Sequence, residues 1–162
     1  MTIDPVKPSR PSNDWRQTHL GEVFRRATER FEHRVGALMA ADDTLSLMLA
    51  RLATDPRLTA SHIHITRHLP REGCSLSALA RRAGISKQAM AKLVDPCIAW
   101  GLVQRAAEPR DARAIRISFT EAGLGWLDAY ERAVTRAETE FAETIGLEVA
   151  TVAQLGLEVY AI

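Results

Sequence analysis

The chain has 162 residues, of which 46% are hydrophobic and 25% are charged, and its formal net charge is +1. This length suits one well-buried domain, which buries about two-thirds of the unfolded chain's surface, so no second domain is expected. No apolar run approaches the roughly 20 residues that cross a bilayer, and the first residues lack a signal peptide's apolar core, so we expect a cytoplasmic protein with no membrane partner.

Residues 1–13 contain three prolines among Ser, Arg and Lys, which is typical of a flexible arm without fixed structure. Directly after it, apolar residues recur at steps of three or four and predict one long amphipathic helix. These residues are Leu20, Phe24, Ala27, Phe31, Val35 and Leu38. A shorter helix over residues 45–53, a turn at Asp55-Pro56 and a helix over residues 58–69 are expected next.

Residues 75–86 predict a helix followed by a tight turn. Four apolar residues share one stripe of that helix: Leu76, Leu79, Ala80 and Ala83. Ser75 suits its N-cap and Gly84 the position just after its C-terminus. After a step at Gly84 and Ile85, Ser86 can cap a second helix.

The second helix has an apolar inner stripe and a polar outer face. The inner stripe consists of Met90, Leu93, Val94 and Cys97. The outer face therefore carries Lys87, Gln88, Ala91 and Lys92. Side chains near the N-terminal end of such a helix contact base edges and phosphates when the helix lies in the major groove.

A β-hairpin is expected over residues 102–107 and 114–120, where Ile115, Ile117 and Phe119 alternate with polar residues. The intervening loop, residues 108–113, reads Glu-Pro-Arg-Asp-Ala-Arg, and we interpret it as the wing of a winged helix. Arg110 and Arg113 bring positive charge to its tip, and Asp111 can hold the Arg113 guanidinium extended. An arginine in a narrow minor groove responds to groove width and negative potential.

The charge distribution supports contact with DNA. Residues 61–120 contain ten Lys or Arg against four Asp or Glu, a net charge of +6, whereas the rest of the chain carries −5. A positive middle between negative ends can neutralise backbone phosphates while the chain stays soluble. The partner that this pattern favours is double-stranded DNA. The candidate contacts are Ser75, Ser86, Lys87, Gln88, Ala91, Lys92, Arg110, Asp111 and Arg113.

The C-terminal region predicts a second long helix from residue 121 to Gly146 and a final helix from residue 147 to about residue 160. Its apolar seam is Leu127, Tyr130, Val134, Ala137, Phe141 and Ile145. Two long amphipathic helices carry more apolar surface than a 60-residue helix-turn-helix can cover. A homodimer, which would match a palindromic operator, covers them best, and a monomeric bundle is the alternative.

Several short segments together resemble the MarR family of bacterial transcriptional regulators over residues 15–162. They are residues 58–62, 79–88, 93–95, 101–105, 111–113 and 119–123. The resemblance implies one mainly α domain over residues 14–162: a winged helix-turn-helix lobe at 58–120, with a three-helix core and a β-hairpin wing, and long dimerisation helices at 14–54 and 121–162.

The same resemblance implies roles for particular segments. Residues 86–92 would enter the major groove, Asp111 and Arg113 would form the wing tip, and the terminal helices would form the dimer interface. Many relatives are repressors that release DNA when a small, commonly aromatic or phenolic, effector binds between the dimerisation helices and the DNA-binding lobe.

The chain departs from the family pattern at Pro96, inside the second helix of the motif. A proline there removes one backbone hydrogen bond and clashes with the preceding turn, at a cost of about 3 kcal/mol. We therefore expect the helix to bend or end early, between residues 94 and 97, and the packing of Ile98 and Trp100 to differ from the family pattern.

Histidine and cysteine side chains suggest weaker alternatives. His64 and His68 have the i, i+4 spacing of a metal-binding pair, but no third ligand is near in sequence, so no metal is expected. His62 falls on an apolar helix face, either lining a ligand cleft or packing in the core. Cys97 lies on an inner stripe, whereas Cys74 precedes a helix and could have the depressed pKa of a redox sensor.

The sequence does not predict an enzyme, and no cofactor is expected. It contains no G-x-G-x-x-G, P-loop, G-x-S-x-G or H-E-x-x-H motif. A winged helix that binds another protein instead of DNA is the alternative, since this fold serves both functions.

Overall fold

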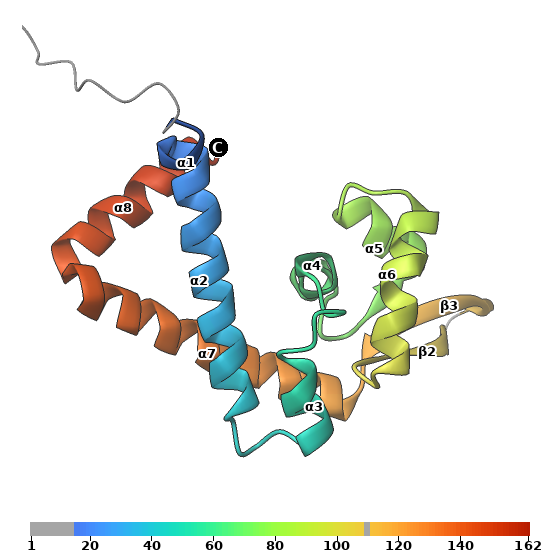
Figure 1. Cartoon of the computed structure of the whole chain (residues 1–162). Coiled ribbons are helices and arrows are strands. Elements are labelled where there is room, and N and C mark those ends of the chain that lie inside the picture. Colours follow the sequence, from blue (N-terminus) through green and yellow to red (C-terminus); the bar gives the residue numbers. More distant parts are fainter. Residues whose placement is uncertain (1–14, 109–110) are drawn as a thin grey trace, which may run out of the picture.

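The computed structural model describes residues 15–108 and 111–162 (Figure 1). The expected flexible arm, residues 1–13, and Arg110 lie outside the described residues. The elements follow in the order α1 (Trp15–Thr18), α2 (Leu20–Ala40), α3 (Leu47–Leu52), α4 (Ala60–His68), β1 (Cys74–Ser75), α5 (Leu76–Arg82), α6 (Lys87–Ala99), β2 (Val103–Glu108), β3 (Asp111–Phe119), α7 (Glu121–Ile145) and α8 (Leu147–Tyr160). The expected fold class, a mainly α winged helix-turn-helix, is confirmed.

Helices α1, α2, α7 and α8 form a part of the molecule that we call the frame, in which α2, α7 and α8 make three sides of a triangle (Figure 1). The Arg34 guanidinium of α2 donates to the Glu140 carboxylate of α7 at 2.6 Å. Both long helices begin and end close to the predicted positions. None of the helices within the described residues is both long and apolar enough to span a bilayer.

The buried seam of α7 differs from the predicted one. Its buried positions are Gly123, Trp126, Ala129, Ala133 and Ala137, so only Ala137 is shared with the predicted seam. Apart from Trp126, these residues are glycine or alanine, whose small size lets α7 approach its neighbours closely. The larger Phe141 and Ile145 are 44% and 37% exposed, because they lie beyond the point where α2 covers α7.

Residues 58–120 fold into a second part, the lobe, which contains α4, α5, α6 and the sheet. The lobe has its own core, formed by Ile65, Leu69, Leu79, Ala80, Met90, Val94, Cys97, Val103, Ile117 and Phe119. The predicted caps are confirmed, since the Ser75 Oγ accepts from the Ala78 amide and the Ser86 Oγ from the Ala89 amide. Gly84 has a φ of +67°, which glycine adopts readily after a helix C-terminus.

The three strands form an antiparallel sheet in the order β1-β3-β2. The prediction of a six-residue wing loop is wrong, because β3 already begins at Asp111 and Glu108 pairs with Asp111 across the hairpin. Backbone pairing thus continues almost to the tip, past a register shift at Ala107 and Glu108. Ile117 points into the core as predicted, whereas Ile115 is 56% exposed because the hairpin extends past the lobe's core.

The expected early end of the second motif helix at Pro96 is also wrong. Helix α6 runs from Lys87 to Ala99 with Pro96 inside it. Packing offsets the lost hydrogen bond, since Val94 and Cys97 on either side of Pro96 are buried in the lobe core. The Trp100 amide donates to the Pro96 carbonyl at 2.9 Å and closes the last turn.

Candidate nucleic-acid interface

The N-terminal half of α6 presents a polar surface supported by the lobe core. Lys87, Gln88 and Lys92 are exposed, and Ala91 is half-buried between them. On the opposite side of the same turns, Met90 is buried against the core. Because the inner face of α6 is fixed by packing, the helix holds its outer side chains in place for contact with a rigid partner.

The two capping serines are placed differently with respect to a partner. The Ser86 hydroxyl is exposed at the start of α6, where helix amides also point outward. Ser75 is half-buried at the start of α5, although the two serines cap alike: the Ser75 Oγ accepts from the Ala78 amide at 3.2 Å and the Ser86 Oγ from the Ala89 amide at 3.1 Å. Ser86 is therefore the more accessible of the two predicted contacts.

Two cations that the sequence reasoning missed lie beside this surface. Arg81 and Arg82 form the exposed last turn of α5, directly before the turn into α6. The first helix of a helix-turn-helix crosses the phosphate backbone, so this position suits phosphate contacts. Their position in the sequence, just before the turn at Gly84, could have identified both arginines as candidate contacts.

Polar contacts fix the hairpin relative to α6. Arg105 on β2 forms an ion pair with Asp95 on α6 at 2.5 Å. Arg116 on β3 donates through Nε to the Glu72 carbonyl at 2.9 Å. The first pair could not be found from sequence spacing, because only the hairpin's return past α6 brings its two residues together. The hairpin and the polar outer face of α6 therefore belong to one structurally supported unit.

The wing tip is described by its backbone alone. Asp111 and Arg113 lie at the start of β3, but their side chains are outside the described residues, as is the whole of Arg110. The expected contact between Asp111 and Arg113 and their approach to a minor groove stay predictions.

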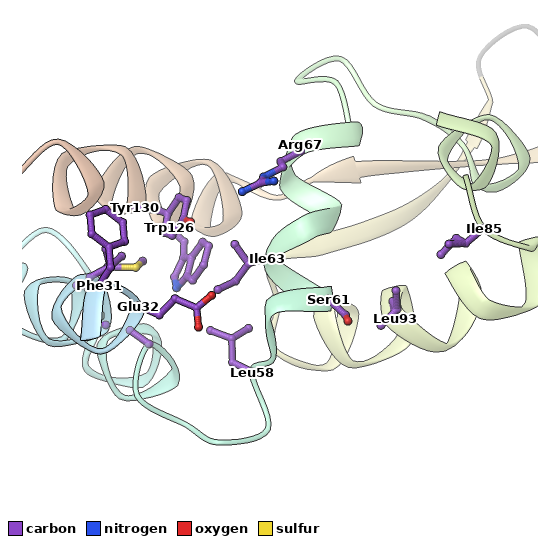
Figure 2. Close-up of a pocket in the computed structure, with 14 residues that line it drawn as sticks. Phe31, Glu32, Leu58, Ser61, Ile63, Arg67, Ile85, Leu93, Trp126 and Tyr130 are labelled. Atoms are coloured by element: carbon purple, nitrogen blue, oxygen red, sulfur yellow. The ribbon is translucent and has the colours of Figure 1, made fainter. Parts of the chain in front are cut away.

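A cavity of about 410 Å³ lies between the frame and the lobe (Figure 2). Aromatic rings from the frame form part of its wall, and the Trp126 and Tyr130 rings are parallel within 3° with centroids 5.7 Å apart. The Trp126 indole Nε1 is buried without a hydrogen-bond partner among the described residues. Burial raises the pKa of Tyr130, an effect that Arg67 opposes and Glu32 reinforces.

His62 lies outside the lining of this cavity. Its Nδ1 accepts from the Thr59 amide at 3.2 Å and contacts the Thr59 hydroxyl at 2.9 Å, forming the capping box that starts α4 at Ala60. The ring also meets Trp100 edge-on, with centroids 5.0 Å apart. Burial lowers the pKa of His62, which favours the neutral ring that can accept these hydrogen bonds. A separate cavity beside it measures only about 20 Å³.

The metal and redox alternatives gain no support. Among the described residues, no group of three or more His, Cys, Asp or Glu could hold a metal ion. The depressed pKa expected of Cys74 is wrong, because burial raises the pKa of this thiol and outweighs the opposing charges of Arg82 and Arg116. Cys97 is buried in the lobe core, and burial raises its pKa to about 11.

Comparison with known proteins identifies the lobe and the overall fold. Residues 58–114 match the model of the MarR family. The transcriptional regulator AdcR of Streptococcus pneumoniae is 25% identical over 84 residues, which are 52% of this chain and 58% of AdcR. The chain therefore matches little more than half of that relative's length.

Two solved structures share the fold over most of both chains. The transcriptional repressor CouR, bound to a 23-mer DNA duplex, aligns with a TM-score of 0.59 and 19% identity over 95% of this chain and 100% of CouR. The PcaV transcriptional regulator of Streptomyces coelicolor, in complex with its natural ligand, aligns with a TM-score of 0.55 and 19% identity over 94% of this chain and 98% of PcaV. Residues 58–114, which contain the helix-turn-helix and most of the hairpin, are thus similar to the MarR family, and the two solved structures show that the chain as a whole has the same fold as these proteins.

Proposed function

We propose that this protein is a transcriptional regulator that binds double-stranded DNA in a sequence-specific manner. The observation that carries the proposal is the outer face of α6, where Lys87, Gln88 and Lys92 are exposed on a helix whose inner face is buried in the lobe core. Arg81 and Arg82 extend this polar surface along α5. The DNA-bound state of CouR, which has the same fold, supports the same use of the lobe here.

We further propose that the protein acts as a homodimer on a palindromic operator. The support is apolar surface that the frame leaves uncovered. On α8, Val152, Leu155 and Val159 fall at i, i+3 and i+7, and each is more than half exposed. Exposed apolar patches of this kind mark protein interfaces. A twofold dimer would present two copies of α6 to successive half-sites.

The proposed regulation is release of a repressor from its operator by a small ligand. The cavity between frame and lobe supports it, because its volume and mixed aromatic and polar lining suit a small molecule. A ligand wedged between the two parts would change how the lobes are spaced. The PcaV complex shows that a protein of this fold holds its natural ligand.

The proposal is tested by fluorescence anisotropy with DNA from upstream of the protein's own gene and with a scrambled duplex, each at two salt concentrations. Tight, salt-dependent and duplex-selective binding is expected. Equal weak binding to both duplexes would favour a protein-interaction module, and no binding at low salt would overturn DNA binding.

Three variants locate the contacts. Arg113→Ala should weaken operator binding by about 1–3 kcal/mol if the wing reaches the minor groove. Lys92→Ala should weaken binding to all duplexes and lower the salt slope by about one unit, as should Lys87→Ala. Arg51→Ala, an exposed cation on α3 outside the lobe, is the control and should change neither quantity.

A further inference from the structure

The chain uses its two kinds of cationic side chain very differently. Of its 21 Lys and Arg residues only three are lysines, namely Lys7, Lys87 and Lys92, and Lys7 lies outside the described residues. Among the described residues, arginine supplies the cation of every ion pair. Both described lysines lie on one surface, the outer face of α6.

Within the part of the chain that the structure describes, neither lysine amine is held by a carboxylate. Lys87 opens α6, whose first turn contains no acidic residue. Asp95, one turn after Lys92, forms an ion pair with Arg105 on β2 at 2.5 Å instead. Both lysines are exposed, and α6 lies apart from α2 and α8 of the frame (Figure 1). A reagent in solvent can therefore reach both amines.

Phosphate binding alone does not explain why these two positions hold lysine. A guanidinium donates two parallel hydrogen bonds to a phosphate and stays charged, so arginine serves this contact at least as well. The chain has arginine at the nearby positions Arg81 and Arg82. What lysine adds is an amine that acts as a nucleophile once it has lost its proton.

We propose that Lys87 and Lys92 form a modification site at which acetyl transfer from an acyl phosphate switches off DNA binding. The unprotonated Nε attacks the carbonyl carbon of acetyl phosphate, so that an N–C bond forms and the C–O bond to the phosphate breaks. Inorganic phosphate leaves with the bonding electron pair, and a proton of the amine passes to water. This inference rests on the proposed DNA binding and adds a way to regulate it.

The same positive surface acts on the donor and on DNA. Arg81 and Arg82 add to the charge of Lys87 and Lys92, and this charge attracts the negative acyl phosphate as it would attract a DNA phosphate. The amide that forms has no charge and pairs with no phosphate. The arginines keep their protons and do not react in this way. Among the described residues, the loss of charge is thus confined to the outer face of α6.

The two states exclude each other. A duplex bound to α6 covers the two amines, so the DNA-bound protein should resist the reagent. The free protein should react and should then remain free. Duplex DNA added before the reagent should therefore lower acetylation of Lys87 and Lys92, which peptide mass spectrometry measures.

The test treats the full chain with acetyl phosphate and, in parallel, with inorganic phosphate alone. Mass spectrometry should find acetyl groups on Lys87 and Lys92 only after acetyl phosphate. Fluorescence anisotropy should show that the doubly acetylated protein binds duplex DNA at least about tenfold more weakly, with a salt slope lower by about two units. The inorganic phosphate sample should bind like the untreated protein after the phosphate is removed.

Arginine variants locate the effect. A double variant, Lys87→Arg with Lys92→Arg, keeps both charges but has no amine to acetylate there, so treatment should leave its own starting affinity unchanged. Lys7→Arg is the matched control and should lose affinity on treatment as the wild type does. The inference is overturned if Lys87 and Lys92 stay unmodified, if their acetylation leaves the affinity unchanged, or if the double variant loses as much affinity as the wild type.

The untreated protein distinguishes this failure from failure of the proposed function. If it binds duplex DNA but acetylation does not weaken the binding, the inference fails alone. If it binds no duplex even at low salt, the regulator proposal fails and the switch fails with it, whereas mass spectrometry still measures whether the two lysines react.

Discussion

The lobe and the frame solve the problem of burying apolar side chains in different ways. The lobe closes a core of ten buried residues around α4, α5, α6 and the sheet, and among its larger apolar residues Ile85 and Ile115 are exposed. Most of the large apolar residues that are exposed within the described chain lie in the frame. Helix α8 alone contributes Leu147, Val149, Val152, Leu155, Leu157, Val159 and Tyr160.

This difference indicates which part is complete within one chain. The lobe has the buried core of an independent unit, whereas the frame has an uncovered apolar surface of the kind that associates with another copy. The two parts meet where α7 leaves the hairpin and where α4 faces α2 across the cavity. Different substitutions can therefore test the lobe, the frame and the region where they meet, which we call the junction.

The largest effect is expected at the junction, at Gly123 in the first turn of α7. A Cβ on this residue would lie 1.8 Å from the Leu102 carbonyl oxygen, and the contact is with backbone, so no side-chain rotation relieves it. Gly123→Ala should destabilise the chain by about 3 kcal/mol or more, measured by urea unfolding. Separation of α7 from the hairpin would also lower the cooperativity of the transition.

Gly125, two residues further along α7, provides the matched control. A Cβ there meets nothing within 4 Å, and the residue is exposed. Gly125→Ala should stabilise the protein by about 0.5–1 kcal/mol, because alanine loses less conformational freedom in a helix. Equal effects of the two variants would mean that the close approach of α7 to Leu102 is wrong.

The next largest effect is expected in the lobe. Pro96 lies inside α6, where it removes the hydrogen bond that its amide would give to the Lys92 carbonyl. Pro96→Ala should restore this bond and raise the free energy of unfolding by about 1–2 kcal/mol, after allowance for the more flexible unfolded chain. Urea denaturation with an unchanged m-value would measure it. A loss of stability would show that the proline fits α6 without strain.

How far the sequence predicts this molecule depends on whether a feature is local. The caps at Ser75 and Ser86 and the glycine at position 84 were correct, because each acts within three or four residues of itself. Helix α7 ends at Ile145, with the expected Gly146 as its C-cap, for the same reason. The end of α6 was not predicted, because the local penalty of Pro96 is outweighed by core contacts that only the fold creates.

The candidate site divides along the same line. Exposure of Lys87, Gln88 and Lys92 follows from the helical stripe that buries Met90, and the sequence contains that stripe. The Asp95–Arg105 ion pair joins two different elements, and Glu32 of α2 and Arg67 of α4 line the same cavity. Such groups come together only through tertiary packing, so spacing along one chain does not reveal them.

A smaller effect is expected in the frame, at the exposed face of α8. Val152 is 70% exposed, so Val152→Lys should leave the folded chain intact but weaken self-association at least about tenfold, or about 1.4 kcal/mol. Sedimentation equilibrium measures the dissociation constant. Met48→Lys on α3 changes a similarly exposed apolar residue, which is 65% exposed and lies outside the frame, and is the control. The claim that the frame carries the association surface is wrong if both variants associate like the wild type. It is also wrong if Met48→Lys dissociates as readily as Val152→Lys.

The smallest effect tests the junction again, through the protonation of His62. Its neutral ring caps α4 by accepting from the Thr59 amide, and burial lowers the pKa of His62 in the folded chain below its ordinary value. The unfolded chain therefore binds this proton more tightly. The contribution of His62 to stability is fully present above the unfolded pKa, near pH 6.5, and is lost as pH falls through the lower folded pKa.

His62→Gln separates this effect from that of the other histidines. A glutamine at the third helical position can still accept from the N-cap amide, but it does not titrate. The wild type should therefore lose more thermal stability than the variant between about pH 7.5 and about pH 5.5, in the range where histidine titrates. Because His62 joins the start of α4 to Trp100, which packs against the cores of both lobe and frame, the loss should appear in the cooperative transition of the whole chain. Identical losses in the two proteins would mean that the ring is protonated without breaking the cap, and that the contact between His62 and Trp100 does not couple the two parts.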